Sequence, residues 1–371
     1  MPLLARNSYF ILLYPFSLIY GLIIWLRNIL FDYQFIKSSE FPIPTICVGN
    51  ITVGGTGKTP HIEFLVELLQ DEFRVATLSR GYRRKTKGFI LAGPDSGVSD
   101  IGDEPVQIKQ KYPGIHVAVD RRRVNGIQEL MNRIPDLDVV LLDDAFQHRK
   151  VIAGLSILLI DFNRPISSDH LLPAGRLREH AYERRRANII LITKCPDRLK
   201  PIERRLIVKD LKLYPFQHLF FTKLKYGNPI PVFSDVKVSM SLKEMKASKP
   251  NILMVTGIAG PRLFKKHHRS ISPRITELTY PDHHEFTEKD LEKIISVFEG
   301  LEGEEKFLFT TEKDATRLRK FTNIAIRLKE KIFYVPVGIE VLNEDGENFN
   351  HQIRNYVSSN KRNSILHKTK D

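Results

Sequence analysis

The sequence predicts an α/β protein with a P-loop NTPase-type parallel sheet domain, a smaller C-terminal α/β domain and an N-terminal membrane-associated helix. Three observations support this fold class. Short apolar runs alternate with helical stretches from residue 43 onward, which is typical of a parallel sheet covered by helices on both faces. A glycine-rich turn that ends in Lys58 and Thr59 follows the first apolar run. An uncharged and largely apolar stretch occupies residues 9–26.

The N-terminal stretch 9–26 is rich in Phe, Ile, Leu, Tyr and Trp. As a helix it would be about 27 Å long, close to the hydrocarbon thickness of a bilayer. Arg6 and Arg27 flank the stretch, whereas Pro15 and Gly21 weaken it as a spanning helix. A buried core helix is the alternative that stays open. We expect a membrane-associated helix that spans the bilayer or lies in its interface, with the rest of the chain facing the cytoplasm because a P-loop needs nucleotide.

Residues 49–59, GNITVGGTGKT, have the layout of a P-loop. Such a turn exposes successive backbone N–H groups to phosphate oxygens, and the following helix directs its positive dipole end to the same point. Lys58 is expected to reach the β- and γ-phosphates, and the Thr59 hydroxyl to bind Mg²⁺. Thr52 stands where the strict pattern has a glycine. The predicted nucleotide-binding residues are Thr52, Val53, Gly54, Gly55, Thr56, Gly57, Lys58 and Thr59.

The chain is predicted to fold in four segments. The N-terminal helix covers 1–35, the P-loop domain 36–228, the smaller α/β domain 229–345, and a C-terminal helix with a basic tail 346–371. In the P-loop domain, strands are expected at 43–48, 75–79, 116–118, 139–143, 156–161, 189–193 and 218–224, and helices at 60–70, 104–111, 122–132, 182–187 and 202–213. In the smaller domain, strands are expected at 252–256, 275–280, 306–310 and 332–337, with a helix at 288–298.

The charge balance favours an acidic partner. The 371 residues carry a formal net charge of +14. Nucleic acid, an anionic membrane surface and a phosphorylated substrate would each match this charge. A nucleic-acid partner is not expected, because basic residues and aromatic residues do not interleave as they do in known nucleic-acid modules. Cys47 and Cys195 both lie beside apolar runs and read as reduced core residues.

An apolar run at 139–142 ends in two carboxylates, Asp143 and Asp144. A carboxylate at the end of a strand next to the P-loop strand can reach a Mg²⁺ ion held there. One aspartate alone would read equally well as a helix cap. The pair after four aliphatic residues indicates the metal side of a nucleotide site, with Thr59 as the third predicted ligand.

Basic residues gather at predicted strand ends, where a parallel sheet binds phosphate. A solvated loop is the alternative for each such run. The run Arg184–Arg186 is less well placed, and we interpret it as a solvated or lipid-facing helix surface. The predicted substrate-binding residues are Arg80, Tyr82, Arg83, Glu104, Arg121, Gln147, His148 and Arg176.

Two further motifs could supply acid/base groups. Asp103 opens a predicted helix, where it could cap the helix or act as base for an acceptor hydroxyl, and spacing alone does not separate these roles. In the second domain His283 and His284 follow a strand. Adjacent side chains point in different directions, so one histidine paired with a carboxylate is the favoured acid/base arrangement.

Eight motifs in this order resemble the tetraacyldisaccharide 4'-kinases of lipid A biosynthesis. The resemblance covers nearly the whole chain, to about residue 337, and the threonine in the P-loop is typical of the family. The motifs are GNITVGGTGKTP, LSRGYRR, GDEP, LLDDAFQHR, LLPAGRLRE, TGIAGPRLF, PDHHEF and TTEKDATRL.

The resemblance implies transfer of the γ-phosphate of ATP, with Mg²⁺, to the 4'-hydroxyl of a tetraacyldisaccharide 1-phosphate at the cytoplasmic face of the inner membrane. By the same resemblance Asp103 is the catalytic base, His283 assists it, and Lys58 acts on the phosphates. Ala145 stands where a glycine often follows the paired aspartates. The partners implied are the lipid disaccharide 1-phosphate and the anionic membrane surface, and we expect a monomer.

Because the base and the histidine belong to different domains, the domains are expected to close over ATP before transfer. A membrane-associated P-loop GTPase is the alternative. The segments 192–197 and 311–314 are faintly similar to guanine-reading Asn-Lys-x-Asp loops, but neither contains the asparagine.

Overall fold

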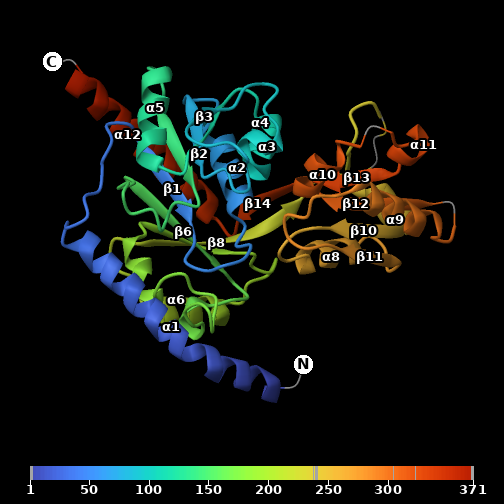
Figure 1. Cartoon of the computed structure of the whole chain (residues 1–371), viewed down its shortest axis with the longest axis horizontal. Coiled ribbons are helices and arrows are strands. Elements are labelled where there is room, and N and C mark those ends of the chain that lie inside the picture. Colours follow the sequence, from blue (N-terminus) through green and yellow to red (C-terminus); the bar gives the residue numbers. More distant parts are fainter. Residues whose placement is uncertain (1–2, 237, 239–240, 304, 322, 369–371) are drawn as a thin grey trace. The chain divides into compact units, whose positions relative to one another are not determined.

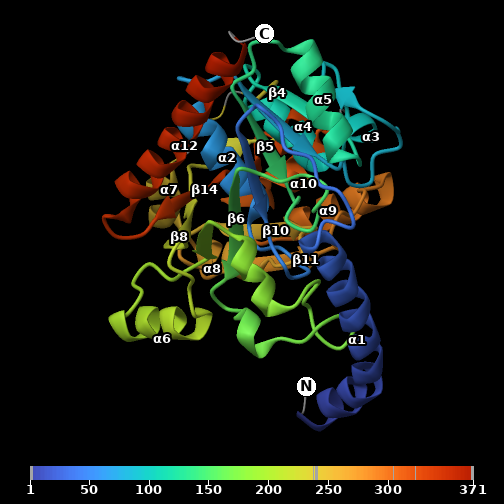
Figure 2. The same ribbon diagram turned by 90° about the vertical axis from the view of Figure 1, so that its left-hand side faces the viewer.

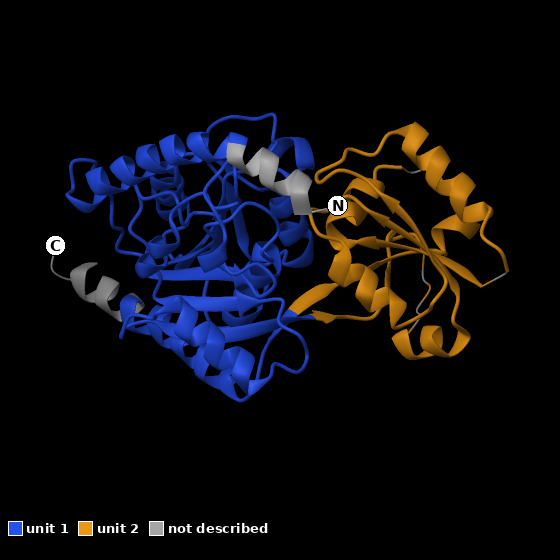
Figure 3. Ribbon diagram, turned by 90° about the horizontal axis from the view of Figure 1, so that it is seen from below, with its two compact units in different colours: residues 1–224, 339–371 blue, residues 225–338 orange. Residues whose placement is uncertain are grey.

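The computed structural model describes residues 3–368 apart from 237, 239, 240, 304 and 322, and gives the backbone alone for 3–11 and 361–368. The predicted basic tail at 369–371 and the side chains of Arg6 and Tyr9 therefore lie outside the described residues. Contacts divide the chain into two compact units, residues 1–224 with 339–371 and residues 225–338, shown in blue and orange in Figure 3.

The first unit is built on a nine-stranded sheet with the strand order β14-β8-β7-β6-β1-β5-β2-β4-β3 (Figure 1). β1 pairs in parallel with β5 and β6, and Val48 lies opposite Asp143. The ends of β1 and β5 therefore meet at one edge of the sheet. The strands are β1 (Thr45–Gly49), β2 (Val75–Ser79), β3 (Ile90–Leu91), β4 (His116–Val119), β5 (Val139–Asp143), β6 (Leu155–Asp161), β7 (Ile189–Thr193), β8 (His218–Tyr226) and β14 (Val337–Val341).

Helices cover both faces of this sheet, as the predicted fold class requires. On one face α2 (Lys58–Leu69) and α12 (Asp345–Lys368) bury Leu65 and Phe349 among the strand residues, and on the other α5 (Arg123–Arg133) buries Ile127. The remaining helices are α1 (Leu3–Asp32), α3 (Val98–Ile101), α4 (Asp103–Lys111) and α6 (Pro201–Leu211).

The predicted helices and strands recur with two corrections. The segment predicted as a helix at 182–187 is a six-residue 3-10 helix, Ala181–Arg186, and not an α-helix. The strand predicted at 332–337 ends at Val335, because Pro336 has no N–H to continue the ladder, and a separate strand, β14, follows. β14 places α12 back on the first unit, so the chain leaves this unit after Leu224 and re-enters it at Ile339.

Helix α1 lies along the outside of the first unit (Figure 2). Its polar side chains contact the protein, and its large apolar side chains are exposed to solvent. Ser17 Oγ donates a hydrogen bond to the Leu171 carbonyl at 3.0 Å, and the Tyr20 hydroxyl donates to the Arg178 carbonyl at 2.9 Å. The opposite side exposes Leu12, Phe16, Leu18, Ile19, Leu22, Ile23, Trp25 and Leu26. Residues 12–32 are long and apolar enough, by length and composition, to cross a membrane.

The run Arg184–Arg186 is not the solvated surface that the sequence suggested. Arg186 pairs with the fully buried carboxylates of Glu179 and Glu183, and its guanidinium lies over the Phe146 ring at 4.5 Å. Arg185 pairs with Asp32 at the end of α1 at 2.6 Å. Buried carboxylates need cationic partners, and Arg186 serves both glutamates.

The second unit is a smaller α/β layer around a five-stranded sheet with the order β11-β10-β12-β13-β9. Its two apolar clusters lie on the two faces of the sheet. Its strands are β9 (Ile230–Pro231), β10 (Asn251–Thr256), β11 (Ile275–Thr279), β12 (Lys306–Thr311) and β13 (Ile332–Val335), and its helices are α7 (Leu242–Ser248), α8 (Arg262–Arg269), α9 (Glu288–Glu299), α10 (Glu312–Leu318) and α11 (Ile326–Lys329).

Candidate functional site

The glycine-rich turn leads from β1 directly into α2, which begins at Lys58. Gly54 and Gly57 have φ angles of 100° and 89°, a region that residues with a Cβ rarely adopt. Pro60 lies in the first turn of α2, where its missing N–H breaks no helical hydrogen bond. The turn therefore has the backbone freedom and the helix N-terminus that a phosphate site requires.

Side-chain and backbone hydrogen bonds hold the turn in place. Asn50 Nδ2 donates to Thr56 Oγ1 at 2.8 Å, and Thr193 Oγ1 donates to the Thr56 carbonyl at 2.9 Å. Val53 N–H donates to the Arg176 carbonyl at 2.8 Å. Lys194 bridges the Gly55 carbonyl and the Asp161 carboxylate. The loop that suggested a guanine-reading motif therefore supports the P-loop backbone.

His61 links the start of α2 to β8 and was not predicted from the sequence. Its Nδ1 lies 2.7 Å from the Gly57 carbonyl, and its Nε2 lies 3.0 Å from Thr222 Oγ1. Burial lowers the pKa of His61 to about 4, so the ring is neutral and donates from Nδ1 to the carbonyl.

Two cations converge on Asp144 next to the P-loop. Lys58 Nζ lies 3.4 Å from Asp144 Oδ1, and Arg178 Nη1 lies 3.4 Å from both carboxylate oxygens. Asp144 has a φ angle of 48°, a strained conformation that aims its side chain at these cations. Arg178 reaches this position because its N–H donates to the Ile51 carbonyl at 2.8 Å, which lines its segment up against the P-loop.

The pKa values of Asp143 and Asp144 are shifted in opposite directions. Burial, reinforced by the neighbouring Asp144 charge, raises the pKa of Asp143 to about 7. Burial alone would also raise the pKa of Asp144, but Lys58 and Arg178 outweigh it and hold that pKa below its usual value. The buried Asp143 Oδ1 has no hydrogen-bond partner. An orphaned carboxylate oxygen beside a second carboxylate and the P-loop fits a site for a divalent cation such as Mg²⁺, with Thr59 one residue beyond Lys58.

The predicted substrate-binding residues occupy loops at the ends of neighbouring strands. Arg80 follows β2, Arg121 follows β4, and Gln147 and His148 follow β5. Gln147 donates to the Asn50 carbonyl at 2.6 Å. Burial, together with surrounding arginines and Lys150, lowers the pKa of His148 to about 4.

Two other predicted substrate-binding side chains are open to solvent. Tyr82 is exposed, with the Arg83 guanidinium over its ring at 5.7 Å, and Arg176 is also exposed. Arg178, two residues later, is the one that contacts Asp144. The two arginines of LPAGRLRE could have been recognised in the sequence as candidates for this contact. Which of them faces Asp144 depends on the bridge between Leu177 and the P-loop residue Thr52.

Asp103 begins α4 immediately after Gly102, whose φ angle is 93°. A Cβ at Gly102 would lie 2.8 Å from the Tyr82 carbonyl, so the glycine lets two loops of the first unit pack closely. Asp103 is 5% exposed and Glu104 is half-buried. Gly102 is the N-cap of α4, so Asp103 is a buried residue of the first helical turn and not an exposed helix cap.

The two adjacent histidines of the second unit have different surroundings. His284 Nε2 lies 2.9 Å from Asp290 Oδ2, and its ring stacks on Tyr280 at 4.7 Å. Asp290 also accepts from the Thr287 backbone at the start of α9, so His284 is part of a structural cap. His283 instead has a φ angle of 60° and lies in a cationic cluster.

The cluster around His283 comes from α10. Lys313 Nζ lies 3.0 Å from His283 Nε2, and Arg317 Nη2 lies 3.4 Å from Nδ1. Arg317 is fixed in turn by the buried Asp314 at 3.0 Å, which also accepts from Gly257 N–H at 2.9 Å. His283, unlike His284, therefore lies among Lys313, Arg317 and the carboxylate of Asp282.

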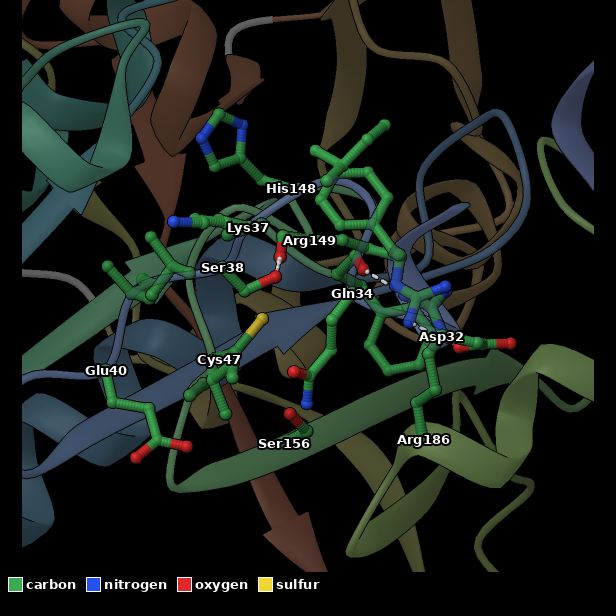
Figure 4. A pocket seen from close by; sticks show the side chains of 18 residues that line it. Asp32, Gln34, Lys37, Ser38, Glu40, Cys47, His148, Arg149, Ser156 and Arg186 are labelled. Atoms are coloured by element: carbon green, nitrogen blue, oxygen red, sulfur yellow. Dashed lines mark hydrogen bonds and ion pairs between the residues drawn. The ribbon is translucent and has the colours of Figure 1, made fainter. Parts of the chain in front are cut away.

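A separate cavity of about 770 Å³ lies beside the C-terminal end of α1 (Figure 4). Its wall includes the Asp32–Arg149 pair, the buried Cys47 and, of the predicted substrate-binding residues, His148. Ser38 donates to the Arg149 carbonyl at 2.6 Å across one side of it. The P-loop residues do not line this cavity, so it is distinct from the nucleotide site.

A parallel sheet, a glycine-rich turn entering a helix at a lysine, and paired aspartates on the adjacent strand define a P-loop protein of the nucleoside-triphosphate-using class. A sequence model described as tetraacyldisaccharide-1-P 4'-kinase matches residues 9–358. The chain therefore belongs to the tetraacyldisaccharide 4'-kinase family, and it is a kinase.

Named relatives agree with this assignment. The tetraacyldisaccharide 4'-kinase of Phocaeicola vulgatus is 49% identical over 354 residues, covering 95% of this chain and 96% of its own. That of Bacteroides thetaiotaomicron is 46% identical over 358 residues, covering 95% and 94%. A crystal structure of LpxK from Aquifex aeolicus in complex with ATP has a TM-score of 0.70 and 27% identity, covering 95% of this chain and 99% of that one. The family, fold class and enzyme class predicted from the sequence are confirmed.

Proposed function

We propose that the protein transfers the γ-phosphate of ATP to the 4'-hydroxyl of a tetraacyldisaccharide 1-phosphate, at the cytoplasmic face of the inner membrane. The observation that carries the proposal is the convergence of Lys58 and Arg178 on Asp144 beside the P-loop, in a chain whose relatives are named for this reaction. The exposed apolar side of α1 supports a lipid acceptor met at a membrane surface. We also propose that the protein works as a monomer.

The phosphates of ATP would lie on the turn 52–57, with Lys58 against the β- and γ-phosphates. Thr59, Asp143 and Asp144 are the residues that would hold Mg²⁺, which supplies positive charge to the phosphates. Lys58 and Arg178, which contact Asp144 in this structure, would contact phosphate oxygens when Asp143 and Asp144 hold Mg²⁺. The cations would then stabilise the charge that develops on the transferring group.

Asp103 is the proposed base. Its carboxylate would accept the proton of the 4'-hydroxyl while that oxygen bonds to the γ-phosphorus, and the bond from phosphorus to the β–γ bridging oxygen would break to release ADP. His283 would assist from the second unit, so transfer would require both units. Lipid binding is assigned to Arg80, Tyr82, Arg83, Glu104, Arg121, Gln147, His148 and Arg176.

The test is incubation of the protein with ATP, Mg²⁺ and the disaccharide 1-phosphate in detergent. Asp103→Asn should lower kcat by roughly 10²–10⁴-fold with nucleotide affinity unchanged, because a general base acts on turnover alone. Asp100→Asn in the preceding helix α3 is a matched control, since its carboxylate accepts from Gly97 N–H at 2.9 Å and from Ser99 Oγ at 3.3 Å. Loss of ATP binding in Asp103→Asn would reassign Asp103 to a structural cap.

A nucleotide competition assay distinguishes the kinase from the alternative, a membrane-associated P-loop GTPase. A kinase of this family should use ATP and form phosphorylated lipid. Strong preference for GTP with no lipid product would overturn the proposed reaction.

A further inference from the structure

Helix α6 and the loop that follows it expose an unusual number of large apolar side chains. Ile202 is 59% exposed, Leu206 58% and Phe216 54%, and Val208 and Tyr214 are also exposed. Tyr214 and Phe216 stack on each other at 5.9 Å, so they form one apolar surface. Such a concentration on one short segment of a folded unit marks a contact surface.

The segment is firmly attached to the first unit by its other side. Leu211 is buried in the core, and Arg204 pairs with Asp345 at 3.0 Å while its guanidinium lies over Phe221. Ile202 and Leu206 are four residues apart and so lie on one side of the helix. The exposed apolar residues are therefore held in place and are not the result of a frayed end.

Basic side chains accompany the apolar ones. Arg205, Lys209 and Lys212 are exposed, and none of them forms an ion pair with another described residue. Large apolar groups beside unpaired basic groups are typical of a helix that lies at the surface of an anionic bilayer, since the apolar groups enter the acyl region and the cations stay with the headgroups.

The position of α6 also fits such a surface. In Figure 1 α6 is seen nearly end-on beside the middle of α1, and in Figure 2 the two helices lie on opposite sides of the same lower end of the first unit. Both apolar segments therefore belong to the same end of the first unit.

We propose that α6 with residues 212–216 is a second contact with an anionic lipid bilayer. This inference rests on the membrane attachment that the proposed function assigns to α1. One helix lying in an interface leaves the protein free to roll about the helix axis. A second contact to one side of that axis prevents rolling and fixes the direction in which the nucleotide edge of the sheet faces relative to the lipid surface.

The experiment measures partition of the full chain onto phospholipid vesicles by flotation. Vesicles of phosphatidylcholine alone are compared with vesicles in which roughly one third of the lipid is phosphatidylglycerol. Leu206→Glu with Phe216→Glu should weaken partition onto the anionic vesicles at least about tenfold, because each change removes apolar area and adds a like charge. Ile326→Glu, at a position 68% exposed in the second unit, is the matched control and should partition as wild type.

A second variant separates charge from apolar contact. Arg205→Gln with Lys209→Gln and Lys212→Gln should lose roughly fivefold per charge on anionic vesicles and little on neutral ones. Thermal unfolding and activity on detergent-dispersed substrate should match wild type for all variants, because these side chains lie outside the nucleotide site.

The outcomes separate the two proposals. If Leu22→Glu with Ile23→Glu in α1 abolishes partition and the α6 variants partition as wild type, α6 is not a bilayer contact and the inference is overturned. The inference is also overturned if the α6 variants change the partition of the protein only when another protein is present on the vesicles. If the wild-type protein itself does not partition, the membrane part of the proposed function fails.

Discussion

At the scale of single residues, the main feature of the site is that two adjacent carboxylates have pKa values shifted in opposite directions. Asp143 is buried and its pKa is raised to about 7, whereas Asp144 faces Lys58 and Arg178 and its pKa is lowered. Asp143 and Asp144 are the carboxylates that would hold a divalent cation beside the P-loop, where Lys58 and Arg178 would be available to phosphate oxygens.

The two arginines of LPAGRLRE give a matched pair of variants. Arg178→Gln should lower kcat roughly 10–100-fold, since a charge that can reach the transferring phosphate is removed. Arg176→Gln should leave kcat within about a factor of three and act, if at all, on the KM for lipid, because its side chain is exposed. Steady-state kinetics against both substrates measures this. Equal loss of kcat in the two variants would contradict the assignment of Arg178 to Asp144.

His268 in α8 makes the second unit sensitive to acid. It is fully buried between Phe264 and Phe309, and burial lowers its pKa to about 4. A pKa depressed in the folded state contributes stability above the unfolded value of about 6.5, and that stability is lost as the pH falls toward 4. The loss reaches roughly 3 kcal/mol for a shift of this size.

His268→Phe should therefore flatten the fall in unfolding free energy between pH 6.5 and 4.5, measured by denaturant titration at several pH values. The test compares the slope of unfolding free energy against pH, so a difference in absolute stability between the variant and wild type does not affect it. An unchanged slope would show that His268 does not titrate in this range.

At the scale of elements, α1 is attached through a buried ionic network. Glu179 is fully buried, and it pairs with Arg186 and lies 3.6 Å from Arg27 of α1. Asn28 also donates to it at 3.5 Å. Burial raises the pKa of Glu179, and the arginines oppose this effect. The polar side chains of α1 thus attach it to the rest of the first unit, and its large apolar side chains stay exposed.

Glu179→Gln should destabilise the first unit by about 3 kcal/mol, because it removes the buried carboxylate that Arg27 and Arg186 share and leaves Arg186 with Glu183 alone. The control is Glu129→Gln, which removes an exposed pair with Arg133 one helical turn away and should cost less than about 0.5 kcal/mol. Chemical denaturation of both variants measures the difference. Equal effects would argue that the network contributes no more than a surface pair.

At the scale of the whole molecule, the chain passes between the units through two neighbouring strands. β8 crosses out of the first unit after Leu224, and β14 crosses back before Ile339. The two crossing points are tied by the hydrogen bond from Leu342 N–H to the Phe221 carbonyl at 2.8 Å. Each unit has its own apolar core.

Replacing residues 225–338 by a short Gly-Asn turn should therefore give a folded first unit. This protein should bind ATP with a Kd within about threefold of wild type, since the P-loop and its supports remain. It should not phosphorylate the lipid, because His283 is removed. Calorimetric nucleotide binding and a lipid-kinase assay measure the two properties, and full lipid phosphorylation would refute the role given to the second unit.

Much of the fold could be read from local pattern. The strand, turn and helix around Lys58 and the run that ends in Asp143 and Asp144 are consecutive in the chain, so spacing alone places them. The family resemblance added the enzyme class. β14 was missed because a five-residue strand after Pro336 has no distinct period of its own.

The sequence by itself determined the P-loop, the paired aspartates, the alternating α/β order and the apolar character of the N-terminal helix, because each depends on neighbours a few residues apart. The tertiary structure alone decided that Arg178 meets Asp144, that the polar side of α1 is the docked side, and that Arg186 is paired inside the protein. These contacts join segments more than 30 residues apart or depend on which face is buried. Long-range packing and the need of buried charges for partners settle them, and no local period encodes either.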